Sequence, residues 1–477
     1  MGLVTPVDPV PVDELGKVHF VAIGGAGMSG IARIMLSRGV TVSGSDSAAS
    51  PLLDELAAGG ARVAVGHTAG NLGDADTVVI STAIRPDNPE LVEAQRRGLR
   101  VLHRAAALAS IMLGHQGIVI AGTHGKTTTT SMITTVLLHS GFEPSYVIGG
   151  ILAETGLGAA EGTGPAVVVE ADESDGSFLM LSPDATVVTS VEADHLDNYG
   201  TLAAIEEAFA TFVARISPGG LLLACADDAG ARALGAGVQP TVTVLTYGTA
   251  ADASYRVSDI RARGMRTEFT ITGGRGTVLA GAGPVQLEIA VPGRHNALNA
   301  AATFALTVQL GVSVADAVSG LAAYRGARRR MELKGEADGV QVIDSYAHHP
   351  TELAADLAAA RDIATGGRVI AIFQPHLFSR TRFFATDFGA ALGRADEVIV
   401  LDIYAAREDP EPGVTGKLVS DAVPGGGALF VPDRDAVPAV AAGLAKPGDL
   451  VLTMGAGDVT ALGPQIVQAL RERAAGP

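Results

Sequence analysis

Residues 121–130 offer the clearest chemistry in this chain and read Ala-Gly-Thr-His-Gly-Lys-Thr-Thr-Thr-Thr. They follow an apolar run at 118–120 and precede a segment, 128–140, whose apolar residues recur at helical spacing until Gly141. This order predicts a strand, a glycine-rich loop and a helix. In such a loop, backbone N–H groups surround phosphate oxygens, a lysine supplies positive charge and a threonine hydroxyl reaches a bound magnesium ion. The segment therefore predicts a site for ATP or GTP.

The loop is a shortened variant of the usual nucleotide-binding pattern. Gly122 and Gly125 let the backbone close around phosphate, and Lys126 and Thr127 follow in the expected order. The full pattern Gly-x-x-x-x-Gly-Lys-Thr would also need glycine at position 120, where this chain has isoleucine. Alternatively, the threonines only begin a helix, because threonine is favoured at helix caps. The strand before the loop and the helix after it favour nucleotide binding.

Acidic clusters follow two further apolar strands of this region. The strands cover 166–169 and 186–191, and the clusters run from Glu170 to Asp175 and from Glu192 to His195. Ligands of open α/β sheets lie beyond the carboxyl ends of the strands, so the clusters and the phosphate loop are expected to converge. Carboxylates and an imidazole there suit a magnesium site. For Asp175 and Glu192 alone, a solvated loop or a helix cap is the better interpretation, whereas Glu170 emerges from a wholly apolar strand and is interpreted as a ligand.

A second glycine-rich turn lies at 25–30 and reads Gly-Ala-Gly-Met-Ser-Gly. Asp46 stands 21 residues beyond Gly25, at the end of the next predicted strand, which is the spacing of a dinucleotide-binding loop. That spacing alone does not separate NAD from any other diphosphate, and glycine turns without a ligand are common. Strands alternate with helical patterns up to about residue 108, which predicts a parallel sheet. The predicted strands are 19–23, 40–43, 63–65 and 78–81.

Residues 241–291 have a different pattern, with four β-rich runs and no helices between them. They predict an antiparallel insertion in the second region. The runs cover 241–246, 255–260, 267–272 and 285–291. Directly afterwards, Asn296 and Asn299 lie near the start of an alanine-rich helix. They are either helix caps or, being three apart on one helical face, a pair that reads the edge of an adenine.

A third region begins near Tyr324 and is again α/β, with a polar cluster after each predicted strand. The strands are 340–343, 369–373, 397–401 and 450–453, and the clusters begin at Asp344, Gln374, Asp402 and Gly455. Four polar ends at one sheet edge predict a binding site, although His349 or His376 singly can be an ordinary hydrogen-bonded histidine. The arginines at 328–330, 380 and 382 suit capture of phosphate or carboxylate, the alternative being a solvated basic face.

The composition limits the classes of protein and partner. At 477 residues, the length predicts about three domains. The net charge of −17 argues against a nucleic-acid surface or an anionic membrane as partner. Cys225 is the single cysteine, which excludes an intrachain disulfide and is interpreted as core filler. The sequence shows neither a secretory signal nor an apolar run of membrane-spanning length, so a soluble cytoplasmic protein is expected.

Taken in chain order, these motifs resemble those of the Mur ligases over nearly the whole chain. The motifs are Gly24-Gly25-Ala26-Gly27-Met28, residues 122–128, residues 170–175, Glu192-Ala-Asp-His-Leu-Asp197, Gly293-Arg-His-Asn-Ala-Leu-Asn299, Arg329-Arg330, Tyr346-Ala-His-His-Pro350 and Gln374-Pro-His376. Within the family they are most similar to the members that add L-alanine. The order of the motifs carries the resemblance, because no one of them would be specific.

The resemblance implies an α/β fold of three domains and one reaction. Residues 1–108 would form a Rossmann-like UDP-sugar domain, 109–325 a central P-loop domain for ATP with the antiparallel insertion, and 326–477 a Rossmann-like α/β domain that closes over the nucleotide and brings the amino acid. The implied enzyme joins L-alanine to the lactyl carboxylate of UDP-N-acetylmuramate, using ATP and Mg²⁺ and passing through an acyl phosphate, in peptidoglycan precursor synthesis. No nucleic-acid or membrane partner is expected. The protein is expected to be a monomer or a homodimer.

The resemblance also assigns roles to individual residues. The ATP contacts are Gly122, Thr123, His124, Gly125, Lys126, Thr127, Thr128, Asn296 at the adenine, Arg330 and His348. The magnesium ligands are Thr127, Glu170 and His195. The UDP-sugar contacts are Gly25, Ala26, Gly27, Met28, Ser45, Asp46 and Ser81. The catalytic residues are Lys126, Glu170, His195, Arg380 and Arg382, the last two near the reacting carboxylate and the amino acid.

Two positions distinguish this chain within the family. Asp344 is followed by Ser345, where the alanine-adding members usually have a second aspartate. Residues 196–215 contain no lysine, whereas several sister ligases use a carbamylated lysine there. The absence fits the alanine-adding members better.

Three other functions explain less of the sequence. An NAD-dependent oxidoreductase explains the Gly25 turn and Asp46 but leaves the phosphate loop without a role. An ATP-dependent switch explains the phosphate loop alone. A recycling ligase, which joins a whole tripeptide to the same sugar nucleotide, is the nearest alternative and ranks second.

Overall fold

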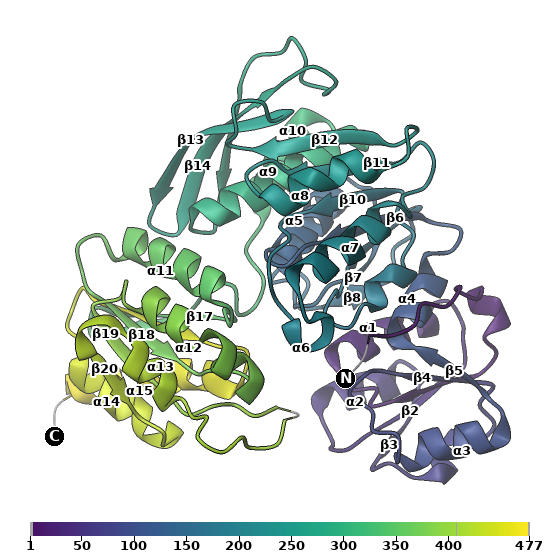
Figure 1. Ribbon diagram of the computed structural model, residues 1–477, viewed down its shortest axis with the longest axis horizontal. Coiled ribbons are helices and arrows are strands. Elements are labelled where there is room, and N and C mark those ends of the chain that lie inside the picture. Colours follow the sequence, from purple (N-terminus) through teal and green to yellow (C-terminus); the bar gives the residue numbers. More distant parts are fainter. Residues whose placement is uncertain (1–2, 407, 476–477) are drawn as a thin grey trace. The chain divides into compact units, whose positions relative to one another are not determined.

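The computed structural model describes residues 3–406 and 408–475. Their strands form three sheets of five, ten and six strands, each with helices against it (Figure 1). Contacts divide the chain into two compact units. The first comprises Met1–Ser258, Ile271–Val285 and Leu298–Tyr324, and the second Asp259–Thr270, Gln286–Ala297 and Arg325–Pro477. The predicted α/β fold class is confirmed.

The first sheet is parallel throughout, as the alternation of strands and helices predicted. Its order is β3-β2-β1-β4-β5. The strands are β1 Val18–Val21, β2 Val42–Asp46, β3 Arg62–Val65, β4 Thr77–Ile80 and β5 Arg100–His103. The helices are η1 Val12–Glu14, α1 Ala26–Ser37, α2 Pro51–Ala58, η2 Ala69–Leu72, α3 Pro89–Arg97 and α4 Arg104–Met112. The sequence did not reveal β5, a four-residue strand with arginine and histidine at its ends.

The central sheet is mixed, in the order β15-β14-β13-β12-β11-β10-β6-β9-β7-β8. Its strands are β6 Gln116–Ala121, β7 Ser145–Val147, β8 Ala159–Ala160, β9 Ala166–Glu170, β10 Ala185–Val188, β11 Leu221–Cys225, β12 Thr243–Gly248, β13 Tyr255–Arg263, β14 Arg266–Gly273 and β15 Val285–Ile289. The helices are α5 Lys126–His139, η3 Ser177–Met180, α6 Leu196–Tyr199, α7 Leu202–Val213, α8 Ala229–Ala233, η4 Leu234–Gly237, α9 Arg294–Gln309 and α10 Val314–Ala323.

The prediction of a wholly antiparallel insertion at 241–291 is wrong in its first part. β12 pairs parallel with β11 and, over two residues, with β13. The chain makes this possible because α8 and η4 lie between β11 and β12 and provide the crossover that parallel strands need. β13 and β14 are joined by only two residues, which permits an antiparallel pair alone.

Helix α5 is buried on nearly all sides although its first residues are threonines. Two of the hydroxyls bond within the helix, because Thr130 donates to the carbonyl of Lys126 and Thr134 to that of Thr130, each at 2.8 Å. The helix that begins at the phosphate loop is therefore fixed inside the central domain. Cys225 is also buried there, as expected of core filler.

The third sheet has the order β16-β17-β21-β18-β19-β20, with only β16 antiparallel to its neighbour. The strands are β16 Glu332–Ala337, β17 Val340–Ser345, β18 Val369–Phe373, β19 Glu397–Val400, β20 Ala428–Phe430 and β21 Leu450–Met454. The helices are α11 Pro350–Ala364, α12 Phe378–Leu392, α13 Lys417–Ala422, η5 Pro424–Gly426, η6 Arg434–Ala436, α14 Val437–Leu444, η7 Asp458–Ala461 and α15 Leu462–Ala475. The sequence did not reveal the edge strands β16 and β20.

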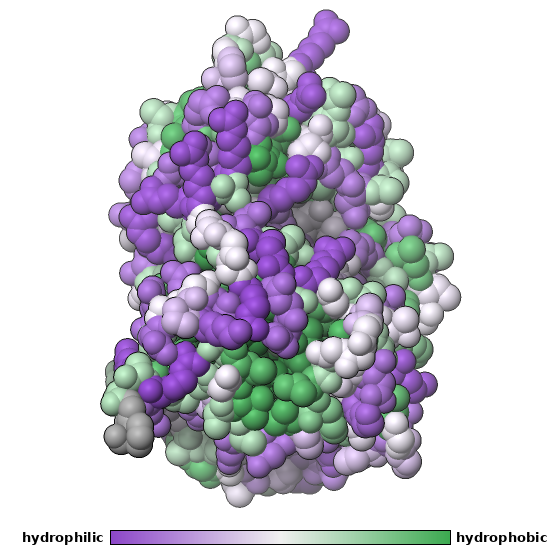
Figure 2. All heavy atoms as spheres, turned by 90° about the vertical axis from the view of Figure 1, so that its left-hand side faces the viewer, coloured by the Kyte–Doolittle hydropathy of each residue, from purple (hydrophilic) through white to green (hydrophobic). Residues whose placement is uncertain are grey.

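The third sheet has an apolar core on each face, one including Phe373 and Phe388, the other Ile370 and Ile466. On the side of this sheet where β20 lies, Figure 2 shows an area where hydrophobic residues gather, with hydrophilic residues around it. None of the helices in the described ranges combines the length and apolarity that a membrane span requires.

Candidate active site

The phosphate loop between β6 and α5 has a backbone that requires glycine at two positions. Gly122 has a φ of 132° and Gly125 a φ of 79°, a region that other residues rarely adopt. Ser190, just beyond β10, holds the loop in place. Its carbonyl accepts from the N–H of Thr123 at 2.9 Å and its hydroxyl from the N–H of His124 at 3.1 Å. The predicted strand, glycine loop and helix are confirmed.

Lys126 is the first residue of α5 and turns its ammonium back over the loop. Nζ donates to the carbonyls of Gly122 and Thr123, at 2.6 and 3.0 Å, and to Glu173 Oε1 at 2.8 Å. Burial alone would lower the pKa of Lys126, but Glu173 and two further carboxylates raise it above its ordinary value. The loop therefore holds a charged ammonium where nucleotide phosphates are expected.

Thr127 and Glu170 lie side by side at the carboxyl end of β9. The Thr127 hydroxyl donates to Glu170 Oε1 at 2.8 Å, and Glu170 Oε2 accepts from the N–H of Gly149 at 2.7 Å. A hydroxyl and a carboxylate beside a phosphate loop are the hard oxygen ligands that magnesium prefers. These residues fit the predicted metal.

His195 is less directly placed for a metal. It precedes α6 with a φ of 52°, and its Nε2 lies 3.5 Å from Asp194 Oδ2. Within the described residues, no hydrogen bond or ion pair joins it to Glu170. Its charge acts on Glu173, whose pKa is raised by burial despite the opposing effects of Lys126 and His195. The second metal site stays a prediction.

The two acids interpreted as solvated or capping groups differ in exposure. Asp175 is buried, accepts from the N–H of Ser177 at 3.0 Å and lies 3.6 Å from His103. It therefore closes a tight turn just before η3, whose N-cap position is Gly176. Glu192 is half-buried and lies 3.4 Å from His124. Solvation is therefore wrong for Asp175, whereas the Glu192 side chain keeps 35% of its surface exposed.

The N-terminal glycine turn is tied to Asp46. Asp46 Oδ2 accepts from the N–H of Gly24 at 3.0 Å, and Gly25 precedes α1. Ser81 follows β4 and is half-buried. The first turn of α1 holds Ala26, Gly27 and Met28, of which the Ala26 side chain lies outside the described residues. The glycine turn and Asp46 therefore lie together at the carboxyl ends of β1 and β2, as the spacing in the sequence predicted.

Glu90 is a residue of this sheet edge that sequence reasoning missed. It is fully buried and accepts from the Ser45 hydroxyl and the Asn71 amide, both at 2.6 Å, and from the N–H of Thr68 at 3.3 Å. Burial would raise the pKa of Glu90, but hydrogen bonds, first from His19 and then from Ser45 and Asn71, lower it to about 2. Ser45 is thus positioned by a buried carboxylate. In the sequence Glu90 reads as an ordinary acid in the first turn of a helix.

In the second unit, polar residues from the strand ends gather around Tyr346. The guanidinium carbons of Arg329 and Arg330 lie 4.8 and 5.2 Å from the centre of its ring, within cation–π range. The Nδ1 atom of His348 lies 3.0 Å from the Tyr346 carbonyl oxygen. Arg330 and His348, assigned separately to the nucleotide, thus share one cluster.

Arg380 and Arg382 do not share one environment. Both belong to α12, and residues two apart point to different sides of a helix. Arg380 is buried, whereas the side chain of Arg382 is half-exposed, with Nε 3.2 Å from Glu411. Their role near the substrate stays a prediction.

The two asparagines after the insertion also differ. The Asn296 amide donates to the carbonyl of Pro292 at 2.7 Å, and its role as adenine reader stays a prediction. In the first unit, a Cβ on Gly125 would lie 2.7 Å from Asn299 Oδ1. Asn299 therefore lies against the phosphate loop, a contact that sequence reasoning left unassigned.

Ser345, at the position of the family's second aspartate, is buried at the end of β17. Its hydroxyl donates to the buried carboxylate of Asp356 and accepts from the N–H of Ala347 at 3.0 Å. A carboxylate is therefore present beside this position, supplied by α11.

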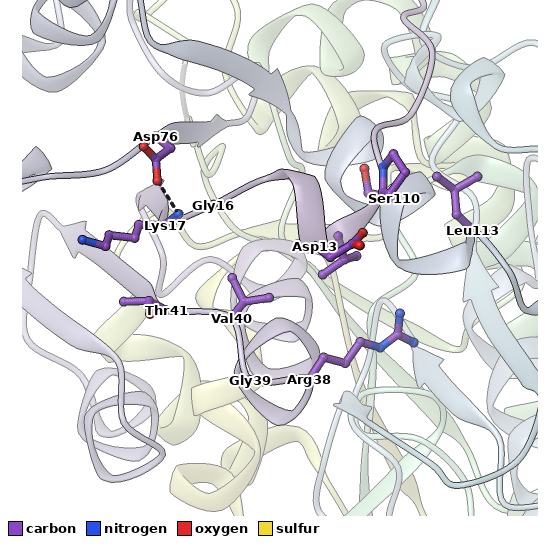
Figure 3. A pocket seen from close by; sticks show the side chains of 12 residues that line it. Asp13, Gly16, Lys17, Arg38, Gly39, Val40, Thr41, Asp76, Ser110 and Leu113 are labelled. Carbon is purple, nitrogen blue, oxygen red and sulfur yellow. Dashed lines mark hydrogen bonds between the residues drawn. The ribbon is translucent and has the colours of Figure 1, made fainter.

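A pocket of about 680 Å³ lies elsewhere in the first unit (Figure 3). Its lining includes Lys17, Thr41 and Asp76, which precede β1, β2 and β4. The backbone N–H of Lys17 donates to Asp76 at 2.8 Å across it. These are the amino ends of the strands, so this pocket is separate from the glycine turn.

Comparisons with known proteins agree with the order of the motifs. The model described as "Mur ligase family, catalytic domain" matches residues 17–116, the "Mur ligase middle domain" matches 120–307, and the "Mur ligase, glutamate ligase domain" matches 329–457. A crystal structure of UDP-N-acetylmuramate-alanine ligase from Thermotoga maritima superposes with a TM-score of 0.80 at 30% identity, covering 96% of this chain and 99% of that one. A murein peptide ligase from Psychrobacter arcticus, at 23% identity and a TM-score of 0.71, shares the fold.

Curated relatives are more similar in sequence. The UDP-N-acetylmuramate–L-alanine ligase of Thermobifida fusca is 58% identical over 479 residues, covering 98% of this chain and 100% of that protein. The same enzyme of Kineococcus radiotolerans is 53% identical over 470 residues, covering 97% and 98%. The chain therefore belongs to the Mur ligase family.

Proposed function

We propose that this chain joins L-alanine to the lactyl carboxylate of UDP-N-acetylmuramate while ATP is converted to ADP and phosphate, an early step of peptidoglycan synthesis. One observation carries the proposal: Lys126, Thr127 and Glu170 converge on a phosphate loop in a chain 58% identical over its length to an alanine ligase.

The reaction requires two anions to meet. The substrate carboxylate attacks the γ-phosphorus of ATP, ADP leaves, and the amine of L-alanine then displaces phosphate from the acyl phosphate. Attack on a polyanion is slow unless its charge is neutralised, so catalysis depends on positioning and electrostatics. We propose that Lys126 neutralises part of the phosphate charge, since its ammonium is charged and is held over the loop by three acceptors.

Magnesium would be held by Thr127 and Glu170. When bound, it supplies positive charge that neutralises the phosphates. Glu170 keeps one oxygen on Gly149 N–H and directs the other toward Thr127, so its carboxylate is oriented before a metal arrives. His195 is proposed as a ligand of a second ion.

The remaining assignments are part of the proposal. The Gly25 turn with Ser45, Asp46 and Ser81 binds the UDP-sugar. The arginines of the second unit, with His348, contact the nucleotide and the amino acid, and Asn296 reads the adenine. We propose further that the enzyme acts in the cytoplasm, where ATP and nucleotide sugars are made, as a monomer or homodimer, and that its domains divide near 108 and 325.

Phosphate release from MgATP tests the function. Wild-type protein should release phosphate with UDP-N-acetylmuramate and L-alanine together, and much less when either is omitted. Glycine, L-serine and the tripeptide L-alanyl-γ-D-glutamyl-meso-diaminopimelate serve as alternative acceptors. Release with the tripeptide only would establish the recycling ligase instead, and release that ignores both substrates would establish an ATP-dependent switch.

A further inference from the structure

Arg104 connects the N-terminal glycine turn with the acidic cluster of the central domain. It is the first residue of α4, and its side chain lies beside Gly27, the second residue of α1. A Cβ on Gly27 would lie 3.5 Å from Arg104 Nη1 and 3.8 Å from its Cδ. The side chain therefore lies directly against the backbone that is proposed to hold the diphosphate.

The other side of the guanidinium faces Asp172. Nη2 of Arg104 donates to Asp172 Oδ2, two residues beyond Glu170 in the chain. The charge of Asp172 also acts on Lys126. One cation thus stands between the glycine turn and the acids beside the phosphate loop, all within the first unit.

Arg104 has donors that the protein leaves open. Its side chain is 20% exposed, and among the described residues Nη1 and Nε have no hydrogen-bond partner. A guanidinium presents its donors in a planar fork that suits phosphate oxygens. The helix that carries this fork is firmly packed, because residues 105–112 of α4 are all buried.

From this geometry we infer that Arg104 binds the diphosphate of the UDP-sugar and that Asp172 holds the guanidinium in place until the diphosphate arrives. The inference rests on the proposed function, which assigns a UDP-sugar to the Gly25 turn. The diphosphate brings negative charge to the side of Arg104 that has open donors. Asp172 then competes with the ligand for the same cation.

A purely structural role gives different expectations. If Arg104 only ties α4 to the acidic cluster, removing either partner breaks the same bond, so Arg104→Ala and Asp172→Asn would weaken ligand binding equally. If Arg104 binds the diphosphate, Asp172→Asn removes the competitor and leaves binding as tight as in wild type or tighter. The two variants therefore separate the roles.

Equilibrium binding without ATP provides the test, with UDP-N-acetylmuramate, UDP and UMP as probes on the full chain. Arg104→Ala should weaken UDP-N-acetylmuramate and UDP roughly 10- to 100-fold, the usual range for loss of a charged hydrogen bond. UMP lacks the second phosphate, so the preference for UDP over UMP should shrink with the substitution. Arg104→Lys should fall between, because lysine retains the charge but not the fork.

Arg33→Ala is the matched control. Arg33 lies on α1 of the same domain and pairs with Glu55 at 3.0 Å, so its removal should leave all three affinities unchanged. Retained MgADP binding shows that each variant is folded. The inference is overturned if Arg104→Ala and Arg104→Lys keep the wild-type preference for UDP over UMP, or if Asp172→Asn weakens UDP as much as Arg104→Ala does. Failure of wild-type protein to bind UDP-N-acetylmuramate would instead refute the proposed function, and this inference with it.

Discussion

Replacing Glu90 with glutamine should loosen the whole N-terminal sheet. Both carboxylate oxygens of Glu90 accept hydrogen bonds, one from Ser45 and the other from Asn71 and the N–H of Thr68. A glutamine amide has one oxygen and one NH₂ group. If the NH₂ replaces the oxygen that faces Asn71 and Thr68, it meets two donors; if it replaces the other, the hydrogen bonds of Ser45 and His19 to that oxygen are lost. In either orientation buried groups lose a charged acceptor.

The pKa gives the magnitude. The pKa of Glu90 falls from 4.5 to about 2 in the folded chain. At about 1.4 kcal/mol for each tenfold change in proton affinity, the ionised carboxylate contributes about 3 kcal/mol to the free energy of unfolding. The folded pKa lies below the unfolded one, so this stabilisation is complete above about pH 4.5 and is lost as the pH falls toward 2. At pH 7 the substitution should therefore lower the free energy of unfolding of this sheet by about 3 kcal/mol.

Amide hydrogen exchange measured by mass spectrometry can follow this sheet alone, which suits a chain of several domains. Peptides from β1 and β2 should exchange roughly a hundredfold faster in Glu90→Gln at pH 7, and those from the third sheet should not change. Glu93→Gln is the control on the same helix. The pKa of Glu93 is also lowered to about 2, by Arg96 and then Arg97, but Glu93 is only half-buried and the Arg96 side chain is 70% exposed, so solvent screens the pair. Equal effects of the two substitutions, or exchange in Glu90→Gln within a few-fold of wild type, would refute the reasoning.

Three further outcomes concern the phosphate loop. Lys126→Ala should abolish phosphate release while UDP-sugar binding in a titration persists, because the glycine turn belongs to a different sheet; loss of both would contradict that division. Gly125→Ala should weaken ATP at least tenfold in the same kind of titration, since the residue has a φ of 79° and its new Cβ would lie 2.7 Å from Asn299 Oδ1; unchanged ATP affinity would argue against the loop. Glu170→Gln should raise the Mg²⁺ concentration needed for half-maximal activity roughly tenfold or more, and full wild-type turnover in excess EDTA would exclude a magnesium role.

The sequence predicted the features that depend on local pattern. Apolar runs gave the buried parallel strands, and the polar residues after them converge because the carboxyl ends of parallel strands share one edge. Short edge strands such as β20, with three residues, carry too little pattern to be recognised. The direction of β12 was mistaken because strand direction depends on the connection and not on the residues of the strand itself.

The contacts that sequence could not supply are those between elements distant in the chain. Glu90, Arg104 and Asn299 have unremarkable neighbours in sequence, and each acquires its role from a partner elsewhere. Glu90 of helix α3 meets Ser45 of strand β2, Arg104 meets Gly27 of the first glycine turn, and Asn299 meets the second. The spacing of glycines in the sequence predicts a loop, but only the folded structure shows which distant side chain contacts that loop.

The carboxylates of Asp46 and Glu170 share one further feature, which explains why positions 24 and 149 are glycine. Asp46 accepts from the N–H of Gly24 at 3.0 Å, and Glu170 from the N–H of Gly149 at 2.7 Å. A Cβ would lie 2.8 Å from the carboxylate at Gly24 and 2.6 Å from it at Gly149, so both are glycine because a carboxylate approaches the backbone. In each pair one oxygen orients the acid and leaves the other for a ligand or its neighbour. Substituting either glycine should therefore displace the acid as well as the turn, which makes these glycines part of the sites their carboxylates form.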